Sequence, residues 1–233
     1  MTREDLKQYS PWNLEATAKI LARRFPDSVV MVIKPAAMFL NMFSIFSNFL
    51  PFSNDGIPEI GGETESVGHL VRLYRNCLET DRQARISNKV ENACTDSIED
   101  IFSKPISLVG FSKGCVVLNQ LMFDLDPNTQ DEDQRKFIKN LKAVYWLDSG
   151  HVGDKNAWIT DHEVLKKLKD LNLSLYVHVT PYQIRDSIRK WIGEEEEIFV
   201  QKLKDLGANI TEKKHFFREK GSIENHFKIL KEF

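Results

Sequence analysis

The chain has 233 residues, of which 42% are hydrophobic and 28% are charged, and its formal net charge is −2. This length suits one sizeable hydrophobic core and is short for two, so we expect a single domain over residues 1–233. The small net charge gives no electrostatic reason to expect a nucleic acid or an anionic membrane surface as a partner.

The cysteines, histidines and glycines do not form the spacings of common cofactor sites. Cys77, Cys94 and Cys115 include no C-x-x-C pair and leave one cysteine over, which favours reduced thiols in a cytosol-like or matrix compartment. The six histidines include no i,i+4 pair, so we expect no zinc. The glycines fit neither the dinucleotide fingerprint nor the P-loop. We therefore expect no metal and no cofactor.

The chain shows no secretory signal and no convincing mitochondrial targeting segment, because Met1–Asp5 carries acidic residues where a basic start is needed. The apolar tract from Met38 to Phe52 is interrupted by polar residues and by Pro51. It is also too short to span a bilayer. We expect a soluble protein without a transmembrane segment.

The first half of the chain predicts a helix, a strand and a second, polar helix. A helix follows Ser10-Pro11, because apolar residues then recur at helical spacing up to Phe25. Val29–Ile33 is an apolar run typical of a buried strand. A phenylalanine-rich tract and a turn-rich segment lead to a polar helix from about Val67 to Cys94.

Strands and helices then alternate to the end of the chain. Short apolar runs predict four strands, at Pro105–Val109, Ala143–Leu147, Ser174–Val179 and, more polar, Asn209–Thr211. Helices are predicted between and after them, at 115–123, 163–170, from about 194 to Gly207, and from Ser222 onward. The fold class is therefore α/β, with a mainly parallel sheet and helices on both faces.

The segment Gly110-Phe111-Ser112-Lys113-Gly114 fits the G-x-S-x-G pattern of a nucleophile elbow. An apolar strand precedes it and an apolar helix follows it, which is the context such an elbow needs. Glycines at both ends suit a sharp turn in which the serine adopts a strained backbone conformation. The alternative is a plain strand-to-helix turn with a surface serine.

A nucleophilic serine needs a base, and the base needs an acid that fixes its tautomer. In α/β-hydrolases these residues follow in the order Ser, acid, His. Asp186 lies after the late strand that stops at Pro181, and His226 lies after the last strand. We therefore predict a triad of Ser112, Asp186 and His226. Asp148, at the end of the preceding strand, is the alternative acid.

Each of these residues has a second interpretation. His226 could be an ordinary surface histidine, and Asp186 could cap a turn or pair with Arg185 or Arg189. Cys115 directly follows the motif, but on an apolar helix it is better explained as a small buried residue than as a nucleophile.

The oxyanion hole is less clear from the sequence. The backbone amide of Lys113, directly after the serine, is the expected first donor. A second donor normally comes from a loop between an early strand and the first helix, and no strand is evident before the helix that follows Pro11. This favours a sheet without its N-terminal strands. The tract from Met38 to Leu50 is either a lid or acyl-chain wall, or a loop buried against the sheet.

Five segments together resemble the animal family of chromosome 2 open reading frame 69 proteins. They are Gly110–Met122, Tyr145–Asp148, Val179–Gln183, Trp191–Gly193 and Ser222–Phe227. The resemblance extends from about Trp12 to the C-terminus, and Phe39–Ile101 is its most divergent part. It implies an α/β-hydrolase-like fold, a mitochondrial location, no defined substrate and additional sequence before the region matching Trp12.

These observations lead to two hypotheses of different classes. In the first, the protein is a serine hydrolase that acts on an ester, a thioester or a related acyl bond of a small-molecule substrate. In the second, it is a hydrolase-like protein without turnover that binds or scaffolds a partner. Fold alone does not separate them.

Overall fold

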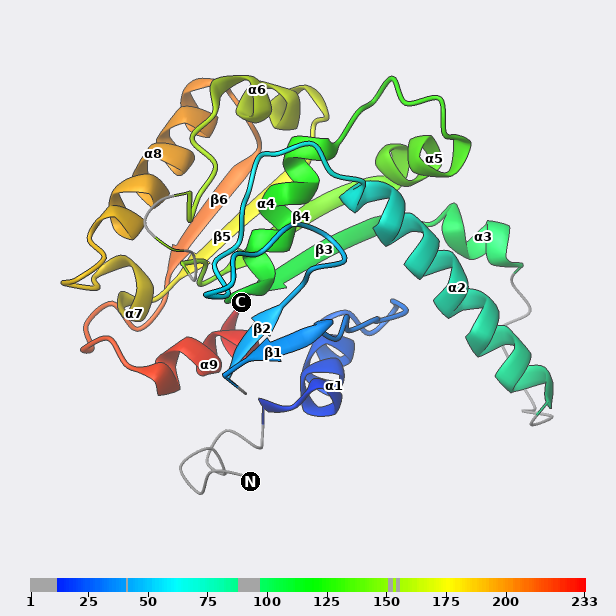
Figure 1. The fold of residues 1–233 in the computed structure, drawn as a ribbon, viewed down its shortest axis with the longest axis horizontal. Helices are drawn as coiled ribbons and strands as arrows, with labels where there is room; N and C mark the ends of the chain where they lie inside the picture. The colour runs from blue at the N-terminus through cyan, green and yellow to red at the C-terminus, as the bar shows by residue number, and fades with distance from the viewer. Residues whose placement is uncertain (1–11, 41, 88–96, 151–152, 154–155) are drawn as a thin grey trace.

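The computed structural model of the chain describes residues 12–40, 42–87, 97–150, 153 and 156–233 (Figure 1). At its centre lies a parallel sheet with the strand order β3-β4-β5-β6. Its strands are β3 (Ile106–Phe111), β4 (Leu141–Leu147), β5 (Ser174–Val179) and β6 (Ile210–Lys214). A separate antiparallel pair contains β1 (Ala37–Phe39) and β2 (Phe43–Ile45).

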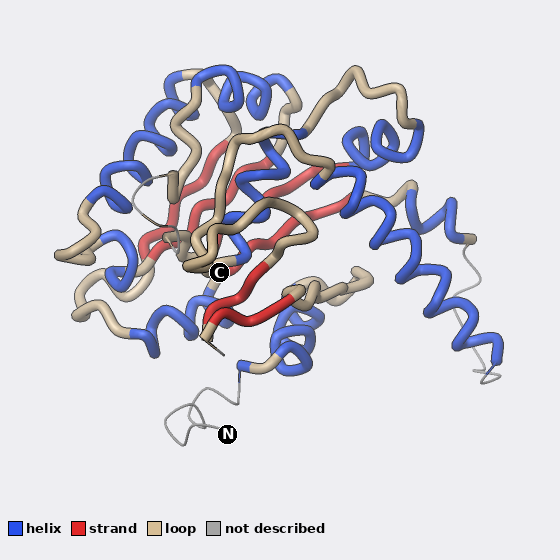
Figure 2. The backbone as a smooth tube through the Cα atoms, viewed as in Figure 1, coloured by secondary structure: helices blue, strands red, loops and turns tan. Residues whose placement is uncertain are grey.

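Helices connect these strands, as the tube in Figure 2 shows. Their bounds are α1 (Leu14–Arg24), α2 (Ser66–Ser87), α3 (Ile98–Phe102), α4 (Gly114–Asp124), α5 (Glu132–Asn140), α6 (His162–Asp170), α7 (Pro181–Ile184), α8 (Trp191–Asp205) and α9 (Ile223–Glu232). The expected α/β class, with a parallel sheet and helices, is confirmed.

Alternating side chains of β4 explain why both faces of the sheet are covered. Val144 and Trp146 belong to one apolar cluster, which also contains residues of α4, α6 and α8. Tyr145 and Leu147 belong to a second cluster with residues of α9 and α1. Because successive side chains of a strand point to opposite faces, a strand that is apolar from Ala143 to Leu147 must be covered on both sides.

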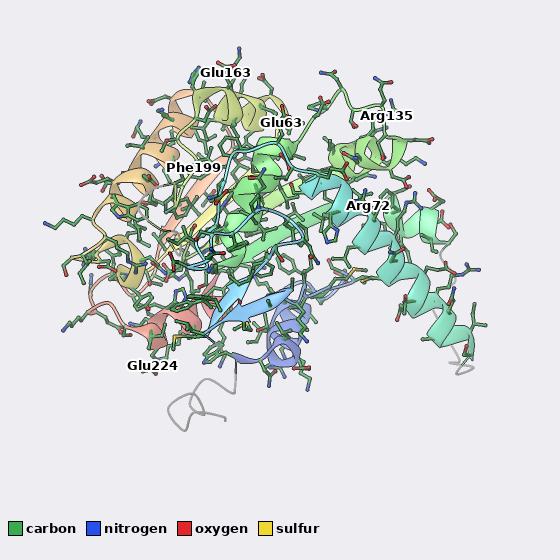
Figure 3. The ribbon with its side chains drawn as sticks, viewed as in Figure 1. Glu63, Arg72, Arg135, Glu163, Phe199 and Glu224 are labelled. Atoms are coloured by element: carbon green, nitrogen blue, oxygen red, sulfur yellow. The ribbon has the colours of Figure 1, made fainter. Side chains whose placement is uncertain are left out.

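Helix α8 shows how the first face is filled. Phe199, labelled in Figure 3, packs its ring 5.3 Å from that of Trp146 and 5.4 Å from that of Trp158. Trp146 also donates its indole N–H to Asn119 Oδ1 at 2.9 Å, so this buried polar group is satisfied. The packing fixes α8 against the sheet.

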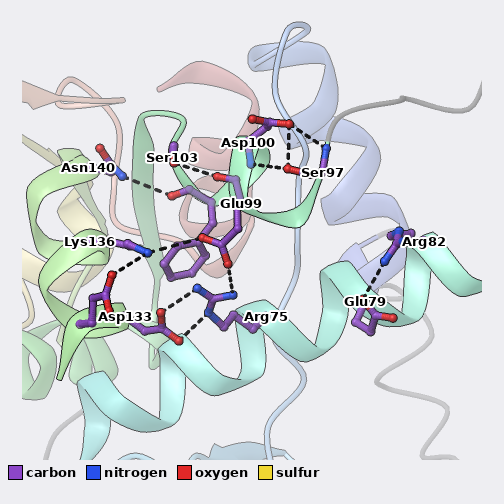
Figure 4. Close-up of polar contacts among 12 residues, drawn as sticks. Arg75, Glu79, Arg82, Ser97, Glu99, Asp100, Ser103, Asp133, Lys136 and Asn140 are labelled. Carbon is purple, nitrogen blue, oxygen red and sulfur yellow. Dashed lines mark hydrogen bonds and ion pairs between the residues drawn. The ribbon is translucent and has the colours of Figure 1, made fainter.

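A network of charged side chains joins α2, α3 and α5 (Figure 4). Arg75 on α2 donates hydrogen bonds to Glu99 at 2.8 Å and to Asp133 at 2.6 Å. Lys136 lies 3.6 Å from Glu99. The hydrogen bond to Glu99 raises the pKa of Arg75, and the guanidinium also lies 4.3 Å from the ring centre of Phe102. The network holds α2 beside the start of β3.

The predicted strand Val29–Ile33 and the predicted polar helix differ from the structure. Val29–Ile33 is not a strand: it has no ladder partner among the residues that the structure describes, and Val29 is exposed. The run is apolar enough for a strand, but its side chains line a cleft instead of a sheet face. The polar helix is α2 and ends at Ser87, and the remainder up to Cys94 lies outside the described residues, as do Ser10 and Pro11.

The tract from Met38 to Leu50 divides into an exposed part and a buried part. Its first part forms the hairpin of β1 and β2, in which Met38, Leu40 and Phe43 are exposed. Its last residues, Phe49 and Leu50, are buried in the core. No helix among the described residues is long and apolar enough to cross a membrane.

Candidate active site

Ser112 lies in the turn between β3 and α4. Its φ of 55° is left-handed, a conformation that residues other than glycine rarely adopt. Its amide donates to Leu147 O on the neighbouring strand at 2.9 Å. A side chain at Gly110 would meet Leu118 at 2.6 Å, so only glycine permits α4 to fold back this closely over β3. The turn therefore lifts Ser112 beyond the carboxyl end of the strand.

His226 approaches Ser112 from α9. Ser222 caps this helix by accepting from the amide of Asn225, and His226 is placed on the first turn after the cap. The imidazole is 1% exposed and its ring centre lies 4.8 Å from that of Phe111 and 5.0 Å from that of Tyr182. Its Nε2 lies 3.0 Å from Ser112 Oγ.

Asp148 holds the other side of the imidazole. It directly follows β4, has a φ of 52°, and is fully buried. Its Oδ2 lies 2.7 Å from His226 Nδ1. Thr180, just after β5, donates its amide to Oδ1 and its hydroxyl to Oδ2, both at 2.7 Å. The carboxylate is thus fixed by two neighbouring strand ends.

The partners decide the tautomer of His226. An ionised carboxylate only accepts hydrogen bonds, so Nδ1 carries the proton and donates it to Asp148. Nε2 of the neutral ring is then an acceptor, oriented toward the hydroxyl of Ser112. The three side chains form one directed chain of hydrogen bonds, and Ser112, at its end, is partly buried.

The predicted acid Asp186 does not reach this chain, and the structure corrects that assignment. The short helix α7 separates Asp186 from the end of β5. Asp186 accepts from the amides of Ile188 and Arg189 and pairs with the Arg189 guanidinium at 2.7 Å. The turn-capping and Arg189-pairing interpretation of Asp186 is the one that the structure supports. Asp148, the alternative acid, occupies the place beside His226.

The order of the strands explains the position of Asp148, which the chain-order rule does not use. The sheet order places β4 directly beside β3. The first residue after β4 must therefore lie next to the first residue after β3, and these residues are Asp148 and Ser112. Asp186 is separated from the end of β5 by α7, so the strand order does not place it next to Ser112.

Lys113 is the N-cap residue of α4, so its backbone amide lies at the amino end of that helix, where partial positive charge gathers. Its ammonium donates to Gly56 O at 2.8 Å and lies 5.3 Å from the ring centre of Phe52. Partial burial lowers the pKa of this ammonium. The side chain thereby holds the loop around Gly56 next to Ser112.

Cys115 is not part of the chain of hydrogen bonds. It is completely buried, and burial raises the pKa of its thiol to about 12. A thiol that stays protonated is not a nucleophile, which agrees with its interpretation as a small buried residue. Within the described part of the chain, no group of His, Cys, Asp and Glu side chains could hold a metal ion.

A second set of contacts, which sequence reasoning missed, supports the loop after Asp148. Glu195 on α8 accepts from the amides of Asn156, Ala157 and Trp158 at 2.9, 2.7 and 3.2 Å. The carbonyl of Ala157 in turn accepts from Ser149 Oγ at 2.9 Å. Glu195 thus fixes the segment around Ala157, to which Ser149, the residue after Asp148, is hydrogen-bonded.

Known relatives are similar in sequence to this chain over nearly its whole length. The model of the C2orf69 family matches residues 1–97 and 75–209. The mitochondrial protein C2orf69 homolog of Mus musculus is 38% identical over 97% of this chain and 71% of its own length. The Homo sapiens protein is also 38% identical, over 68% of its length, and the Danio rerio homolog is 37% identical, over 67%.

This chain belongs to the C2orf69 family. The relatives are named mitochondrial proteins, which supports the mitochondrial location that the resemblance implies. No solved structure is significantly similar to the chain.

Proposed function

We propose that this C2orf69 family member is a serine hydrolase of the α/β-hydrolase type that cleaves an ester, a thioester or a related acyl bond. The observation that carries the proposal is the continuous contact from Ser112 Oγ to His226 Nε2 at 3.0 Å and from His226 Nδ1 to Asp148 Oδ2 at 2.7 Å. A surface serine in a plain turn would not need a buried histidine and a buried carboxylate aligned behind it. In this proposal Gly110–Gly114 is a nucleophile elbow.

The reaction follows from the hydrogen-bond directions. Ser112 Oγ attacks the acyl carbon while His226 Nε2 takes the hydroxyl proton, and the buried Asp148 stabilises the imidazolium that forms. When the tetrahedral intermediate collapses, the bond to the leaving group breaks and His226 returns the proton to that group. Water then attacks the acyl-serine through the same base, which releases the acid and restores the serine.

The oxyanion would be held at the start of α4. The amide of Lys113 belongs to the residue directly after the nucleophile, and the helix end adds favourable partial charge. In this scheme the position of the Lys113 side chain also matters, because its bond to Gly56 O fixes the neighbouring loop. Removing one oxyanion donor typically lowers turnover about a hundredfold to a thousandfold.

Fluorophosphonate labelling tests the proposal. These probes react with serines that a base has activated, so the wild-type protein should be labelled, and Ser112→Ala should abolish labelling. Ser149→Ala is a matched control, because Ser149 is buried and donates to Ala157 O rather than to a histidine. Pure folded protein that is never labelled between neutral and alkaline pH would favour the binding or scaffolding hypothesis.

A further inference from the structure

A large cleft begins at Ser112 and follows β3, the edge strand of the parallel sheet. Its volume is about 2120 Å³, whereas pockets for small ligands usually measure roughly 300–1,000 Å³. Ser112 and His226 line it at one end, and so does every residue of β3 except Gly110. Since a strand rises about 3.3 Å per residue, the path along β3 is about 20 Å long.

The walls of this cleft are mostly apolar. Leu73 and Tyr74 of α2 lie on one side, Leu118 and Leu121 of α4 on another, and Val32 and Ile33 of the N-terminal segment also line it. Of the basic residues that line it, Lys34, Arg82 and Lys104 are exposed, and the partly buried Lys113 donates to Gly56 O. The network around Arg75 in Figure 4 holds the α2 wall in place.

The hairpin of β1 and β2 adds an apolar rim beside Ser112. Leu40 is 71% exposed and Met42 is 44% exposed, and Met42 and Phe43 line the cleft. The ring centre of Phe43 lies 5.8 Å from Lys113 Nζ. Phe39 packs against Gly56, whose carbonyl accepts from Lys113. The rim is therefore tied to the residue that follows the nucleophile.

We propose that this cleft binds the long hydrocarbon chain of an acyl substrate, with the acyl carbon at Ser112 and the chain extended along β3. This inference rests on the proposed function and names its substrate class. The length of β3 is close to that of an extended palmitoyl chain. A short acyl group would leave most of the apolar wall without a partner, whereas a long chain removes from water both its own surface and that of the hairpin rim.

Binding can be measured without turnover. The Ser112→Ala protein should bind a fluorescent palmitate analogue, and the same variant carrying Ser107→Trp should bind it at least about tenfold more weakly. Ser107 is exposed and lines the cleft at the second position of β3, toward the end away from Ser112, so a tryptophan there obstructs the far part of the path and leaves the core intact. Ser103→Trp is the matched control, since Ser103 is exposed and does not line the cleft.

Chain-length preference gives the second measurement. With p-nitrophenyl esters, kcat/KM for palmitate should exceed that for butyrate at least about tenfold, since each methylene that leaves water adds roughly a fourfold gain. Ser107→Trp should lower kcat/KM for palmitate enough to remove most of this preference, whereas the control Ser103→Trp should keep the preference.

The outcomes separate the two proposals. A protein that reacts with fluorophosphonate but prefers butyrate, or binds the palmitate analogue equally with and without Ser107→Trp, overturns the acyl-chain assignment and leaves the hydrolase standing. A protein that is not labelled, but whose analogue binding is lost with Ser107→Trp and kept with Ser103→Trp, supports the cleft and contradicts the hydrolase.

Discussion

At the scale of single residues, Ser112 and Asp148 share an unusual backbone conformation. Their φ angles are 55° and 52°, and they directly follow adjacent strands β3 and β4. Left-handed residues other than glycine cost of order 1–3 kcal/mol each, and they persist where the surrounding structure determines them. Here the amide of Ser112 bonds to Leu147 O and that of Asp148 to His178 O. These bonds aim both side chains at His226.

The assignment of the acid gives a direct prediction. Asp148→Asn should lower kcat by about four orders of magnitude, because an amide beside Nδ1 favours the wrong imidazole tautomer. Asp186→Asn should change kcat by less than about fivefold, because its partly exposed pair with Arg189 is a surface ion pair. Both rates are measured on an ester that the wild type hydrolyses.

Circular dichroism and thermal unfolding of the two variants serve as the control. If Asp186→Asn is the crippling change and Asp148→Asn is mild, while both proteins remain folded, Asp148 is not the acid.

The sequence identified the three hydrogen-bonded residues Ser112, His226 and Asp148 with unequal success, for a physical reason. Ser112 follows from a local pattern, the G-x-S-x-G turn, and His226 follows from its place after the last predicted strand. The choice between two aspartates depends on which strands are neighbours, and pairing of strands is a long-range property. Asp186 fitted the chain order, and α7 then carried it away from the end of β5.

At the scale of elements, Glu195 connects α8 to the loop behind Asp148. Glu195→Gln should lower the free energy of unfolding by about 1–3 kcal/mol, because a carboxylate that accepts from three amides is replaced by a group with one acceptor oxygen. Because Glu195 acts by positioning the loop behind Asp148 and not by binding substrate, Glu195→Gln should lower kcat more than it alters KM.

Glu197→Gln is the matched control on the same helix, since Glu197 is exposed. The measurements are urea unfolding and the separate values of kcat and KM. Equal effects of the two substitutions would mean that the bonds of Glu195 to the loop do not support the site.

The elements differ in how well their residues specify them. β4 was predictable because Ala143–Leu147 is apolar and is covered on both faces. Val29–Ile33 has a similar composition, yet it lines the cleft without joining the sheet. An apolar run predicts that a segment is removed from solvent, but it does not predict whether a neighbouring strand is available for pairing. The β1–β2 hairpin was missed because its strands are very short and exposed.

At the scale of the whole molecule, ionisation of Glu196 should make the free energy of unfolding depend on pH. This carboxyl of α8 is 1% exposed, and neither of its oxygens has a hydrogen-bond partner among the described residues. Burial, and then repulsion from Glu212, raise its pKa to about 7, against attraction from Lys214 and Lys204. In the unfolded chain its pKa is that of an ordinary glutamate.

A carboxyl with a raised pKa in the folded state binds more protons folded than unfolded. Its contribution to stability therefore falls as the pH rises from about 4.5 to about 7. Glu196→Gln should raise the free energy of unfolding by about 1–3 kcal/mol at pH about 8 and change it little at pH about 4. Urea unfolding at both pH values measures this, and an equal gain at both would contradict the ionisation of Glu196 as the cause.

The three residues proposed to act together are far apart in the chain. Ser112 and His226 are separated by 114 positions, and Asp148 and His226 by 78. Contacts of such separation form late, after loops of the same length have closed. The β3–turn–α4 unit has only local contacts, so it can fold early; if His226 is the base, the serine stays unreactive until α9 docks. A chain that enters an organelle amino end first would therefore carry no reactive serine until α9 has arrived. In refolding experiments, labelling of Ser112 should appear after the helical signal has recovered.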